Sequence, residues 1–488
     1  MKEYDVVIIG GGVTGGSVAW HLSHYDVKVL LLEKCADGGM GVTKANSGIV
    51  HGGYSHATTA LKTKLEVRSI PMFDRLQAEL HFPFKRCGIM VIAYAENELE
   101  KCHKLFDQGI ANGIKGMEWC EPDRLLELEP KLPSTVAGGF LVPQGGVIEP
   151  TAYCMRMLES AQKNGVDIAY DSKVTGGEFT DGKWQISVAG QPEKIRCKYV
   201  VNAAGLYADE ISKSFGAEEY TIHPRKGEEY LLDRNSAARP EHVIFPMPTE
   251  HSKGVLVIPT VGGTTMIGPT ADIVDEKEED FTSSENFKRI VKQVKGMING
   301  IAERDVISSF AGLRPVLIGS EDFYIAYSEK VPQFIQAAGI QSPGLTASPA
   351  IGEYITGLLK DGGLTLPPST TPRWIAPAVE EARECTPERL AELHKENPAW
   401  GEFVCRCEKI TEAEIVDAVR HGHITVDGVK FYTRAGMGRC QGGFCQGRIL
   451  HIISRETGIP LEELTKKGGN SYLLSGRLGD LKVKGNEE

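Results

Sequence analysis

The sequence predicts an α/β protein in three parts: a domain built on a parallel sheet, an inserted α+β domain built on an antiparallel sheet, and a small helical C-terminal domain. Three observations support this prediction. A strand–turn–helix–strand pattern opens the chain, short alternating segments fill the region 221–325, and four of the 11 cysteines follow residue 400. At 488 residues the chain is also too long for one ordinary domain.

The opening pattern lies between Tyr4 and Glu33. A short apolar run leads into a G-x-G-x-x-G turn, a helical pattern follows, and a second apolar run ends in Glu33. In such a motif Gly10 makes the tight turn, Gly12 lets a pyrophosphate approach the backbone, and Gly15 lets the helix pack on the strand. The carboxylate of Glu33 can accept hydrogen bonds from ribose hydroxyls. The first part is therefore predicted to be a Rossmann-type dinucleotide-binding domain, and a merely structural glycine turn is the alternative.

Glycines and other small residues continue from Asp37 to Gly53. A backbone with so few bulky side chains can lie flat against a large planar ligand, although a plain flexible loop has the same composition. An amphipathic helix is expected over Leu61–Leu80. The segment 82–140 then leaves the first domain, with a strand over Cys87–Tyr94 and a helix over Glu96–Asn112.

Two later segments are expected to return to the first domain. The apolar strand Tyr199–Gly205 ends in Ala-Ala-Gly, which offers a second close approach to the ligand; an ordinary buried parallel strand is the alternative. Ser342–Ala350 is a turn that feeds a helix over Ile351–Leu359, whose N-terminus can point at the same ligand.

Short alternating segments with turn signals make up residues 221–325, and they predict antiparallel sheet. A large sheet of this kind could roof the ligand and form a substrate pocket. The acidic stretch Asp275–Asp280 is expected to be a solvated loop, and the region closes with Ser309–Pro315.

A proline-dense stretch, Leu366–Pro372, predicts a stiff spacer, and one or two helices are expected over Pro377–Asn397. The last unit holds a helix over Thr411–His421 opened by a capping pair, and ends in a polar tail from Lys466. The expected boundaries are 1–81, 141–220 and 326–362 for the first domain, 82–140 and 221–325 for the substrate domain, 363–401 for a linker with short helices, and 402–488 for the C-terminal domain and tail.

Composition excludes several classes of protein. A formal net charge of −11 argues against binding to nucleic acid or to an anionic membrane surface. No run of about 18 apolar residues predicts a transmembrane helix, and the first strand leaves no room for a signal peptide. Cysteines are too sparse for a secreted disulfide scaffold. We expect a cytoplasmic protein, with any membrane association arising through a partner subunit.

The dinucleotide is expected to be FAD, with NAD as the alternative. Only one G-x-G-x-x-G follows a strand and opens a helix, whereas a flavoprotein that also used NAD would usually show two. Contact points near Asn202–Gly205 and Ser342–Ala347 indicate an extended ligand whose ring would reach the antiparallel domain. The residues expected to bind it are Gly10, Gly12, Val13, Thr14, Gly15, Glu33, Lys34, Thr43, Asn46, Ser47, Val174, Ala204, Gly205, Gly312, Gly344, Leu345 and Thr346.

Four late cysteines form a metal-ligand pattern: C-x-C, 32 residues, C-x4-C. Four thiolates can hold zinc or an iron–sulfur cluster. The spacing is not the paired C-x2-C of zinc ribbons, and a 2Fe–2S cluster would carry electrons away from a flavin one at a time. We therefore expect a 2Fe–2S cluster on these residues, with zinc or unliganded thiols as alternatives: Cys405, Cys407, Cys440 and Cys445.

Two residues are the candidates for substrate chemistry. Oxidising an alcohol by hydride transfer to a flavin needs a base. Histidine side chains in general titrate in the right range, which makes His51 the candidate. Arg314 offers a forked anchor for a carboxylate or phosphate. The alternatives are a histidine that only hydrogen-bonds the flavin or backbone, and a structural ion pair. His223, Arg225 and Lys226 form a second polar group that could equally be a solvated strand edge.

Residues 1–362 resemble the D-amino-acid-oxidase-type FAD superfamily. Val50–Gly53 and Ala311–Pro315 are similar to flavin-linked glycerol-3-phosphate dehydrogenases, in which the matching histidine lies by the flavin and the matching arginine binds the substrate phosphate. Cys405–Glu408 and Arg434–Gly442 resemble the 2Fe–2S domain of the large subunit of anaerobic glycerol-3-phosphate dehydrogenase, a domain type also seen in bacterioferritin-associated ferredoxin.

Other segments depart from that family. Asn46–His51 and Gly339–Thr346 look more like L-2-hydroxyglutarate dehydrogenases, which take a dicarboxylate, while Pro315 favours a phosphate. The resemblance implies oxidation of sn-glycerol 3-phosphate to dihydroxyacetone phosphate, with electrons leaving through the cluster to a second flavoprotein or a quinone-linked subunit. Two alternatives are a 2-hydroxy acid dehydrogenase and a non-catalytic FAD/iron–sulfur electron-transfer subunit.

Overall fold

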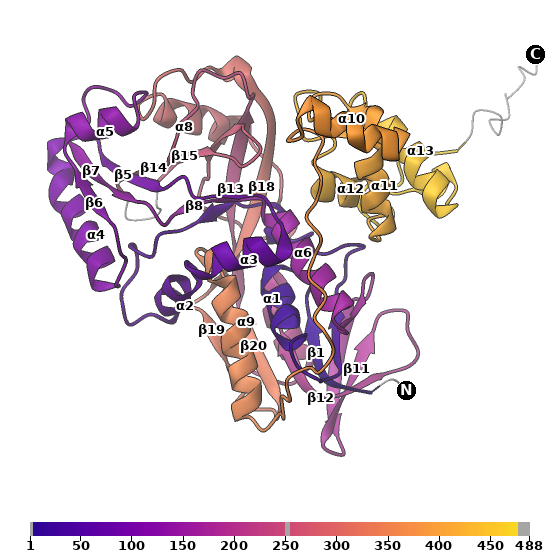
Figure 1. Cartoon of the computed structure of the whole chain (residues 1–488). Helices are drawn as coiled ribbons and strands as arrows, with labels where there is room; N and C mark the ends of the chain where they lie inside the picture. Colours follow the sequence, from indigo (N-terminus) through magenta and orange to yellow (C-terminus); the bar gives the residue numbers. More distant parts are fainter. Residues whose placement is uncertain (1–2, 249–253, 477–488) are drawn as a thin grey trace, which may run out of the picture. The chain divides into compact units, whose positions relative to one another are not determined.

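The computed structural model describes residues 3–248 and 254–476, which fall into two compact units (Figure 1). The larger unit comprises the chain to Lys34 and from Gly38 to Ala378, and the smaller unit comprises Cys35–Asp37 and the chain from Val379. Among the helices of the described residues, none combines the length and apolar character needed to cross a membrane.

The larger unit contains an eight-stranded sheet whose centre is parallel. The strand order is β10–β11–β12–β1–β2–β9, with β20 beside β12 and β19 beside β20. The two halves of β12 have different neighbours, because Ile195–Cys197 pairs with β11 and Val200–Asn202 pairs with β20. The bounds are β1 Glu3–Ile9, β2 Val29–Leu32, β9 Asp167–Ala169, β10 Val174–Thr180, β11 Lys183–Val188, β12 Ile195–Asn202, β19 Tyr324–Tyr327 and β20 Phe334–Ala338.

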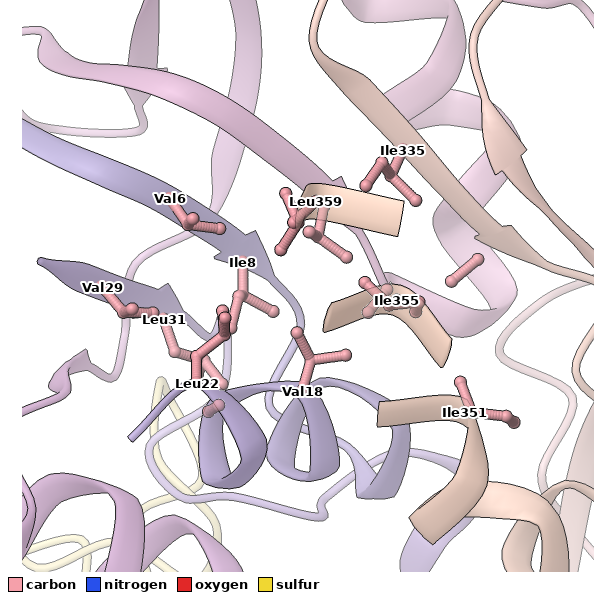
Figure 2. Packing of buried hydrophobic residues seen from close by; sticks show 14 of the residues in the cluster. Val6, Ile8, Val18, Leu22, Val29, Leu31, Ile335, Ile351, Ile355 and Leu359 are labelled. Carbon is pink, nitrogen blue, oxygen red and sulfur yellow. The ribbon is translucent and has the colours of Figure 1, made fainter. Parts of the chain in front are cut away.

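Helices α1 (Val13–Leu22), α6 (Pro150–Lys163) and α9 (Gly344–Asp361) contribute to one hydrophobic core with this sheet. Figure 2 shows Ile8 of β1, Val18 of α1 and Ile355 of α9 together in this core, and all three side chains are fully buried. Strands buried on both faces are rich in Val, Ile and Leu, which explains the continuous apolar runs of the sequence. The opposite face packs on a second core that includes Trp184, Phe215 and Phe334.

A nine-stranded sheet occupies the rest of the larger unit. Its order is β17–β13–β16–β15–β14–β5–β7–β6, with β18 beside β13. The bounds are β5 Ile89–Ala93, β6 Glu118–Cys120, β7 Gly138–Val142, β13 Ile222–Leu232, β14 Val243–Pro246, β15 Leu256–Pro259, β16 Thr265–Gly268, β17 Asp272–Ile273 and β18 Val306–Leu317. The pairings among the strands of residues 221–325 are all antiparallel, which confirms the prediction for that region. The one parallel pair joins β14 to β5 of the other inserted segment, a pairing that the sequence did not predict.

Two helix predictions need correction. The expected helix over Leu61–Leu80 is two helices, α2 (Leu61–Ser69) and α3 (Met72–Leu80), because Pro71 stands between them as the N-cap of α3. Proline cannot continue the hydrogen-bond ladder of a preceding helix. Helix α8 (Ser284–Val294), capped by the Ser283 hydroxyl, lies within the region for which only strands were predicted.

Further helices and short strands complete the larger unit. They are α4 Leu99–Ala111, α5 Pro122–Leu128 and α7 Ala208–Ser214, the 3-10 helices η1 Val42–Lys44, η2 Glu96–Glu98, η3 Gly205–Tyr207 and η4 Glu303–Asp305, and a small three-stranded sheet of β3 Ile49–Val50, β4 Phe84–Lys85 and β8 Gly146–Ile148.

The smaller unit is mostly helical. Its elements are α10 Pro387–Glu396, η5 Pro398–Gly401, β21 Phe403–Cys405, β22 Ile410–Thr411, α11 Glu412–Arg420, α12 Val426–Thr433, α13 Gln446–Thr457 and η6 Leu461–Glu463. Ile415, Val429 and Ile453 are fully buried in its core. The predicted capping pair is confirmed, since Thr411 and Glu414 form a reciprocal capping box. Of the expected helices over Pro377–Asn397 only α10 forms, and the end of the predicted tail lies outside the described residues.

Candidate functional site

Four segments that are distant in the sequence meet at one edge of the eight-stranded sheet. Strands β1, β2, β12 and β20 run parallel, so their carboxyl ends share an edge. Gly10 follows β1, Glu33 follows β2, Ala204 follows β12, and Gly344 opens α9 soon after β20. Ligands of open α/β sheets bind at this edge. The structure therefore brings together the main cofactor-binding segments that the sequence predicted.

The glycine motif has two closed positions and one open one. Gly10 adopts a positive φ of 110°, and a Cβ there would lie 2.5 Å from the carbonyl oxygen of Ala203. A Cβ on Gly15 would lie 1.9 Å from the carbonyl oxygen of Gly10. Gly12 is the N-cap of α1, and a Cβ there would approach only the hydroxyl of Thr43, at 3.3 Å. The open position at a helix N-terminus fits a pyrophosphate.

The acid at the end of β2 is held in place by the glycine turn. The backbone N–H of Gly11 donates a 2.6 Å hydrogen bond to the Oε2 of Glu33, whose residue is 9 % exposed. The next residue, Lys34, lies with its ammonium 3.4 Å from the ring centroid of Tyr207. A carboxylate beside the glycine turn is suited to accept hydrogen bonds from a ribose. The ammonium of Lys34 instead makes a cation–π contact with Tyr207.

The small-residue loop after β2 is organised by its own side chains. The Thr43 hydroxyl accepts the N–H of Val13 at 3.1 Å, the Asn46 amide donates to the carbonyl of Thr43 at 2.7 Å, and the N–H of Gly48 donates to the Asn46 side chain at 2.8 Å. A Cβ on Gly312 would lie 1.9 Å from the carbonyl oxygen of Ala45. The loop therefore lies directly on β18, where only a glycine admits it.

His51 is tied to the start of α9. Its backbone N–H donates to the Thr346 hydroxyl at 2.8 Å, and that hydroxyl donates to the carbonyl of Ile49 at 3.2 Å. The Nε2 of His51 is hydrogen-bonded to the Ser342 hydroxyl at 3.2 Å. The Phe245 ring lies edge-on, 5.8 Å away between centroids. Thr346 thus positions His51 through its hydroxyl, a contact that the sequence did not reveal.

Arg314 lies across a pair of glycines on the long β13–β18 ladder. The register pairs Arg225 with Arg314, Gly227 with Gly312, and Glu229 with Phe310, so these residues share one face. A Cβ on Gly227 would lie 2.8 Å from Nη2 of Arg314. The guanidinium donates to the carbonyl oxygens of Thr270 and Arg225. These bonds fix its orientation over the space that the two glycines leave.

Glu229 is a candidate functional residue that the sequence did not reveal. One carboxylate oxygen accepts a hydrogen bond from the Ser47 hydroxyl, and the other has no hydrogen-bond partner among the described residues. Burial raises the pKa of Glu229 to about 7, while the Ser47 hydrogen bond and the charge of Arg314 act against that rise. Burial also lowers the pKa of Arg314 to about 10, and Glu229 opposes that change. The sequence feature that could have identified Glu229 is its alternation with Arg225 and Gly227, which places the three residues on one face of β13.

The second polar group of the sequence does not form a single site. Lys226 lies on the opposite face of β13 from Arg225, and its ammonium donates to Glu279 at 2.6 Å. His223 pairs in register with Val316. Because Glu279 belongs to the acidic stretch, and its neighbour Lys277 pairs with Asp209 at 2.7 Å, the stretch is anchored to the domain and not merely solvated.

The four late cysteines come together in the smaller unit. The sulfur of Cys407 lies 3.8 Å from that of Cys405 and 3.9 Å from that of Cys440. A hydrogen bond between Cys405 and Cys445 raises the pKa of Cys405 and lowers that of Cys445. Four thiols in this arrangement fit a 2Fe–2S cluster, which spreads its ligands over two irons.

Glycines line the thiols closely. A Cβ on Gly438 would lie 2.5 Å from the sulfur of Cys407, and the N–H of Gly436 donates to the sulfur of Cys405 at 3.5 Å. Beneath them the buried Glu408 pairs with Arg434 at 3.3 Å. Backbone N–H donors to sulfur are a lever by which proteins tune the potential of a cluster.

Two families match the chain. Residues 5–358 match the family described as FAD dependent oxidoreductase, and residues 403–455 match the BFD-like [2Fe-2S] binding domain. These matches confirm the predictions of FAD over NAD and of a 2Fe–2S cluster over zinc.

Three relatives show what the chain is similar to. A glycerol 3-phosphate dehydrogenase of Caloramator mitchellensis is 39% identical over 97% of this chain and 98% of its own length. An L-2-hydroxyglutarate dehydrogenase of Escherichia coli K12 is 29% identical over 58% of this chain and 69% of its own. The solved structure of dithionite-reduced L-alpha-glycerophosphate oxidase from Mycoplasma pneumoniae, with FAD bound, is 28% identical and covers 78% of this chain and 100% of its own, with a TM-score of 0.74. The chain therefore belongs to the FAD-dependent oxidoreductase family, as an enzyme that uses FAD and carries a 2Fe–2S cluster in its C-terminal domain.

Proposed function

We propose that this enzyme oxidises sn-glycerol 3-phosphate to dihydroxyacetone phosphate and passes the electrons through its 2Fe–2S cluster to a partner protein. The observation that carries the proposal is the 39% identical glycerol 3-phosphate dehydrogenase, because it matches 97% of the chain and so spans both the FAD domain and the cluster domain. The anion-binding geometry of Arg314 supports the same substrate class.

FAD supplies the two-electron oxidising chemistry when bound, and the chain supplies the proton transfer. We assign His51 as the base that takes the hydroxyl proton as the hydride leaves the secondary carbon. The bonds from its backbone to Thr346 and from Nε2 to Ser342 hold the imidazole in one orientation. Because the Ser342 hydroxyl is hydrogen-bonded to Nε2 of His51, it can pass a proton onward.

Arg314 is assigned to the substrate phosphate. Its pKa of about 10 keeps the guanidinium charged at neutral pH. Two of its nitrogens are directed by the carbonyl oxygens of Thr270 and Arg225, which leaves the fork oriented for an anion. Glu229, hydrogen-bonded to Ser47, places a carboxyl near this arginine; it would disfavour a substrate with a second carboxylate in the same place.

The remaining cofactor-binding assignments extend the glycine motif along the sheet edge. Val174 is buried in the core at the start of β10, so its contribution is through the backbone. Gly205, with a positive φ of 57°, opens a 3-10 helix, and Gly344 and Leu345 form the first turn of α9. The domain boundaries given above are part of this proposal. The proposed partner is a second flavoprotein or a quinone-linked subunit. Any membrane association would arise through that partner.

A second candidate function is oxidation of L-2-hydroxyglutarate or another 2-hydroxy acid. The observation that favours it is the 29% identical L-2-hydroxyglutarate dehydrogenase. The non-catalytic electron-transfer subunit is set aside, because the chain belongs to a family of FAD-dependent oxidoreductases.

Anaerobic reduction of the flavin by candidate substrates, monitored through the flavin absorbance, distinguishes these functions. Glycerol 3-phosphate should bleach the flavin rapidly, whereas L-2-hydroxyglutarate, lactate, glycerol and glycerol 2-phosphate should not. Reduction by L-2-hydroxyglutarate alone would move the assignment to the hydroxy acids and give Arg314 to a carboxylate. Reduction by none of these compounds, in protein that dithionite does reduce, would overturn both substrate assignments.

A further inference from the structure

The surface around the cysteine ligands carries charge of one sign. In residues 403–410 and 434–448 the one acidic residue, Glu408, is buried and pairs with Arg434. The exposed charged residues of these segments are all basic: Arg406, Lys409, Arg439 and Arg448. Arg448 has an acidic neighbour, Glu402, at 3.6 Å and lies at the rim. The whole chain has a net charge of −11, so this local positive charge is not a general property of its surface.

An aromatic side chain stands out of the same surface. Phe444, between the ligands Cys440 and Cys445, is 89 % exposed, more than any other large hydrophobic residue that the structure describes. Gln441 and Gly443 are also exposed and Gly442 is buried, so three of the four residues between the two ligands face solvent. Exposed single apolar residues are common, but an exposed aromatic in segments whose exposed charged residues are all basic has the composition of a protein interface, where aromatics and Arg are enriched.

The position of this loop relates it to electron transfer. Cys440 and Cys445 belong to the loop itself, and Arg406 and Arg439 are the chain neighbours of Cys407 and Cys440, whose sulfur atoms lie 3.9 Å apart. Phe444 is itself the chain neighbour of the ligand Cys445, so a molecule that covers Phe444 lies beside the cluster ligands. Complementary charge accelerates the encounter of two proteins and aligns them.

We propose that the exposed loop Cys440–Cys445, with Arg406, Lys409 and Arg439 around it, is the docking surface for an acidic one-electron carrier protein. This inference rests on the proposed function, since it names the class of partner that takes the electrons. Each oxidation of the substrate releases two electrons and two protons. Two carrier molecules are reduced in succession, by one electron each, and the protons pass to solvent.

A single haem carrier in two charge forms tests the charge requirement. Cytochrome c is basic in its native form and acidic once its lysines are succinylated, while the electron-accepting haem is the same. The holoenzyme is first reduced with stoichiometric dithionite, so that the test does not depend on the substrate. At low ionic strength the succinylated form should be reduced about 10-fold faster than the native form, and the difference should shrink as salt screens it.

Variants locate the surface. Arg406→Glu with Arg439→Glu should reverse the preference between the two forms of cytochrome c. Phe444→Ala should slow both reactions without changing the preference. Arg420→Glu, an exposed charge reversal at the far end of α11, is the matched control and should behave as wild type. Visible absorbance of the cluster and of the flavin, measured on every variant, shows that both cofactors are retained.

The outcomes of this test and of the proposed function are separable. Faster reduction of native cytochrome c, or a preference unchanged by the double charge reversal, overturns the docking surface even if glycerol 3-phosphate reduces the flavin. A flavin that glycerol 3-phosphate leaves oxidised overturns the proposed function, while the dithionite-initiated reaction still reports on the docking surface.

Discussion

The hydroxyl of Ser47 donates a hydrogen bond to the carboxylate of Glu229, which lies 182 residues later in the sequence. This bond joins the loop that follows the glycine motif to the strand of the second sheet that also carries Arg225. The contact connects the nucleotide-type domain to the substrate domain at the side of Arg314. It also places a carboxyl group whose protonation changes near neutral pH beside the residues assigned to substrate binding.

The first prediction concerns how the Glu229 carboxyl group makes the free energy of unfolding depend on pH. Its pKa is raised from 4.5 to about 7 in the folded protein. Between these values the folded state holds a proton that the unfolded chain has released, so the free energy of unfolding falls as the pH rises through this window, by on the order of 3 kcal/mol. Glu229→Gln should remove this component of the pH dependence. Urea unfolding of holoenzyme and variant at pH 5 and pH 8 measures it.

Ser47→Ala provides the comparison for Glu229. Loss of the hydroxyl removes a hydrogen bond to the charged form, so the pKa of Glu229 should rise further and the decline in stability should extend to higher pH. A glutamine variant whose stability falls with pH as steeply as that of the wild type would show that Glu229 is ionised throughout.

The second prediction concerns Arg314. Removing a charged hydrogen-bond donor from a desolvated anion should cost about 2–4 kcal/mol in kcat/KM. Arg314→Ala should therefore lower the efficiency with glycerol 3-phosphate by about 10² to 10³, mostly through KM. Arg314→Lys should recover only part, because a lysine keeps the charge but not the fork. Steady-state kinetics with Arg289→Ala, an exposed cation of the same domain, provides the control.

The third prediction concerns His51. Loss of a general base should lower kcat by about 10² to 10⁴, so His51→Ala should act mainly on kcat while KM changes little. Ser342→Ala removes only the group hydrogen-bonded to Nε2 and should have a smaller effect of the same kind. The rate of anaerobic flavin reduction in stopped flow reports this step directly. A full rate in His51→Ala would leave the proton acceptor unassigned.

The fourth prediction concerns the cluster. Cys407 lies within 4 Å of two other ligand sulfurs, so Cys407→Ser should abolish the visible absorbance of the cluster and its iron content. FAD should remain bound in full, because the cysteines and the glycine motif belong to different compact units. Metal analysis after anaerobic purification makes the measurement. Cys385→Ser, a cysteine outside the four-thiol group, should keep both cofactors.

The fifth prediction concerns FAD affinity. Glu33→Gln replaces a carboxylate by an amide, a poorer acceptor for ribose hydroxyls, and should raise the dissociation constant of FAD by about 10-fold, a loss of one charged hydrogen bond. Fluorescence titration of apoprotein with FAD measures the constant. Lys28→Met changes an exposed lysine just before β2, outside the expected FAD-binding residues, and should have little effect.

The parts of the structure that the sequence predicted well are local. The turn at Gly10 and the helix from Val13 follow from neighbouring residues, and the capping box of Thr411 and Glu414 needs only a spacing of three. Pro71 was visible in the sequence and should have divided the helix around it, since proline has no N–H to donate.

The parts that were missed depend on distant partners. Nothing near Glu229 indicates that Ser47 will reach it, and nothing near Thr346 indicates that its hydroxyl will bind the backbone of His51. The parallel pairing of β14 with β5 likewise joins strands that are far apart in the chain, and alternation of apolar residues predicts a strand without predicting the direction of its neighbour. Side-chain direction and sheet pairing therefore needed the structure.

The interlocking of early and late segments constrains how the protein is made. On the ribosome β1 emerges well before its partner β12, which ends at Asn202, and before the helix that holds His51, which begins at Gly344. Until that helix has left the exit tunnel, the sheet edge lacks one of its four segments and the nascent chain has no complete flavin pocket. Cofactor capture must then come late in synthesis, and the first two-thirds of the chain must stay competent to fold while it waits.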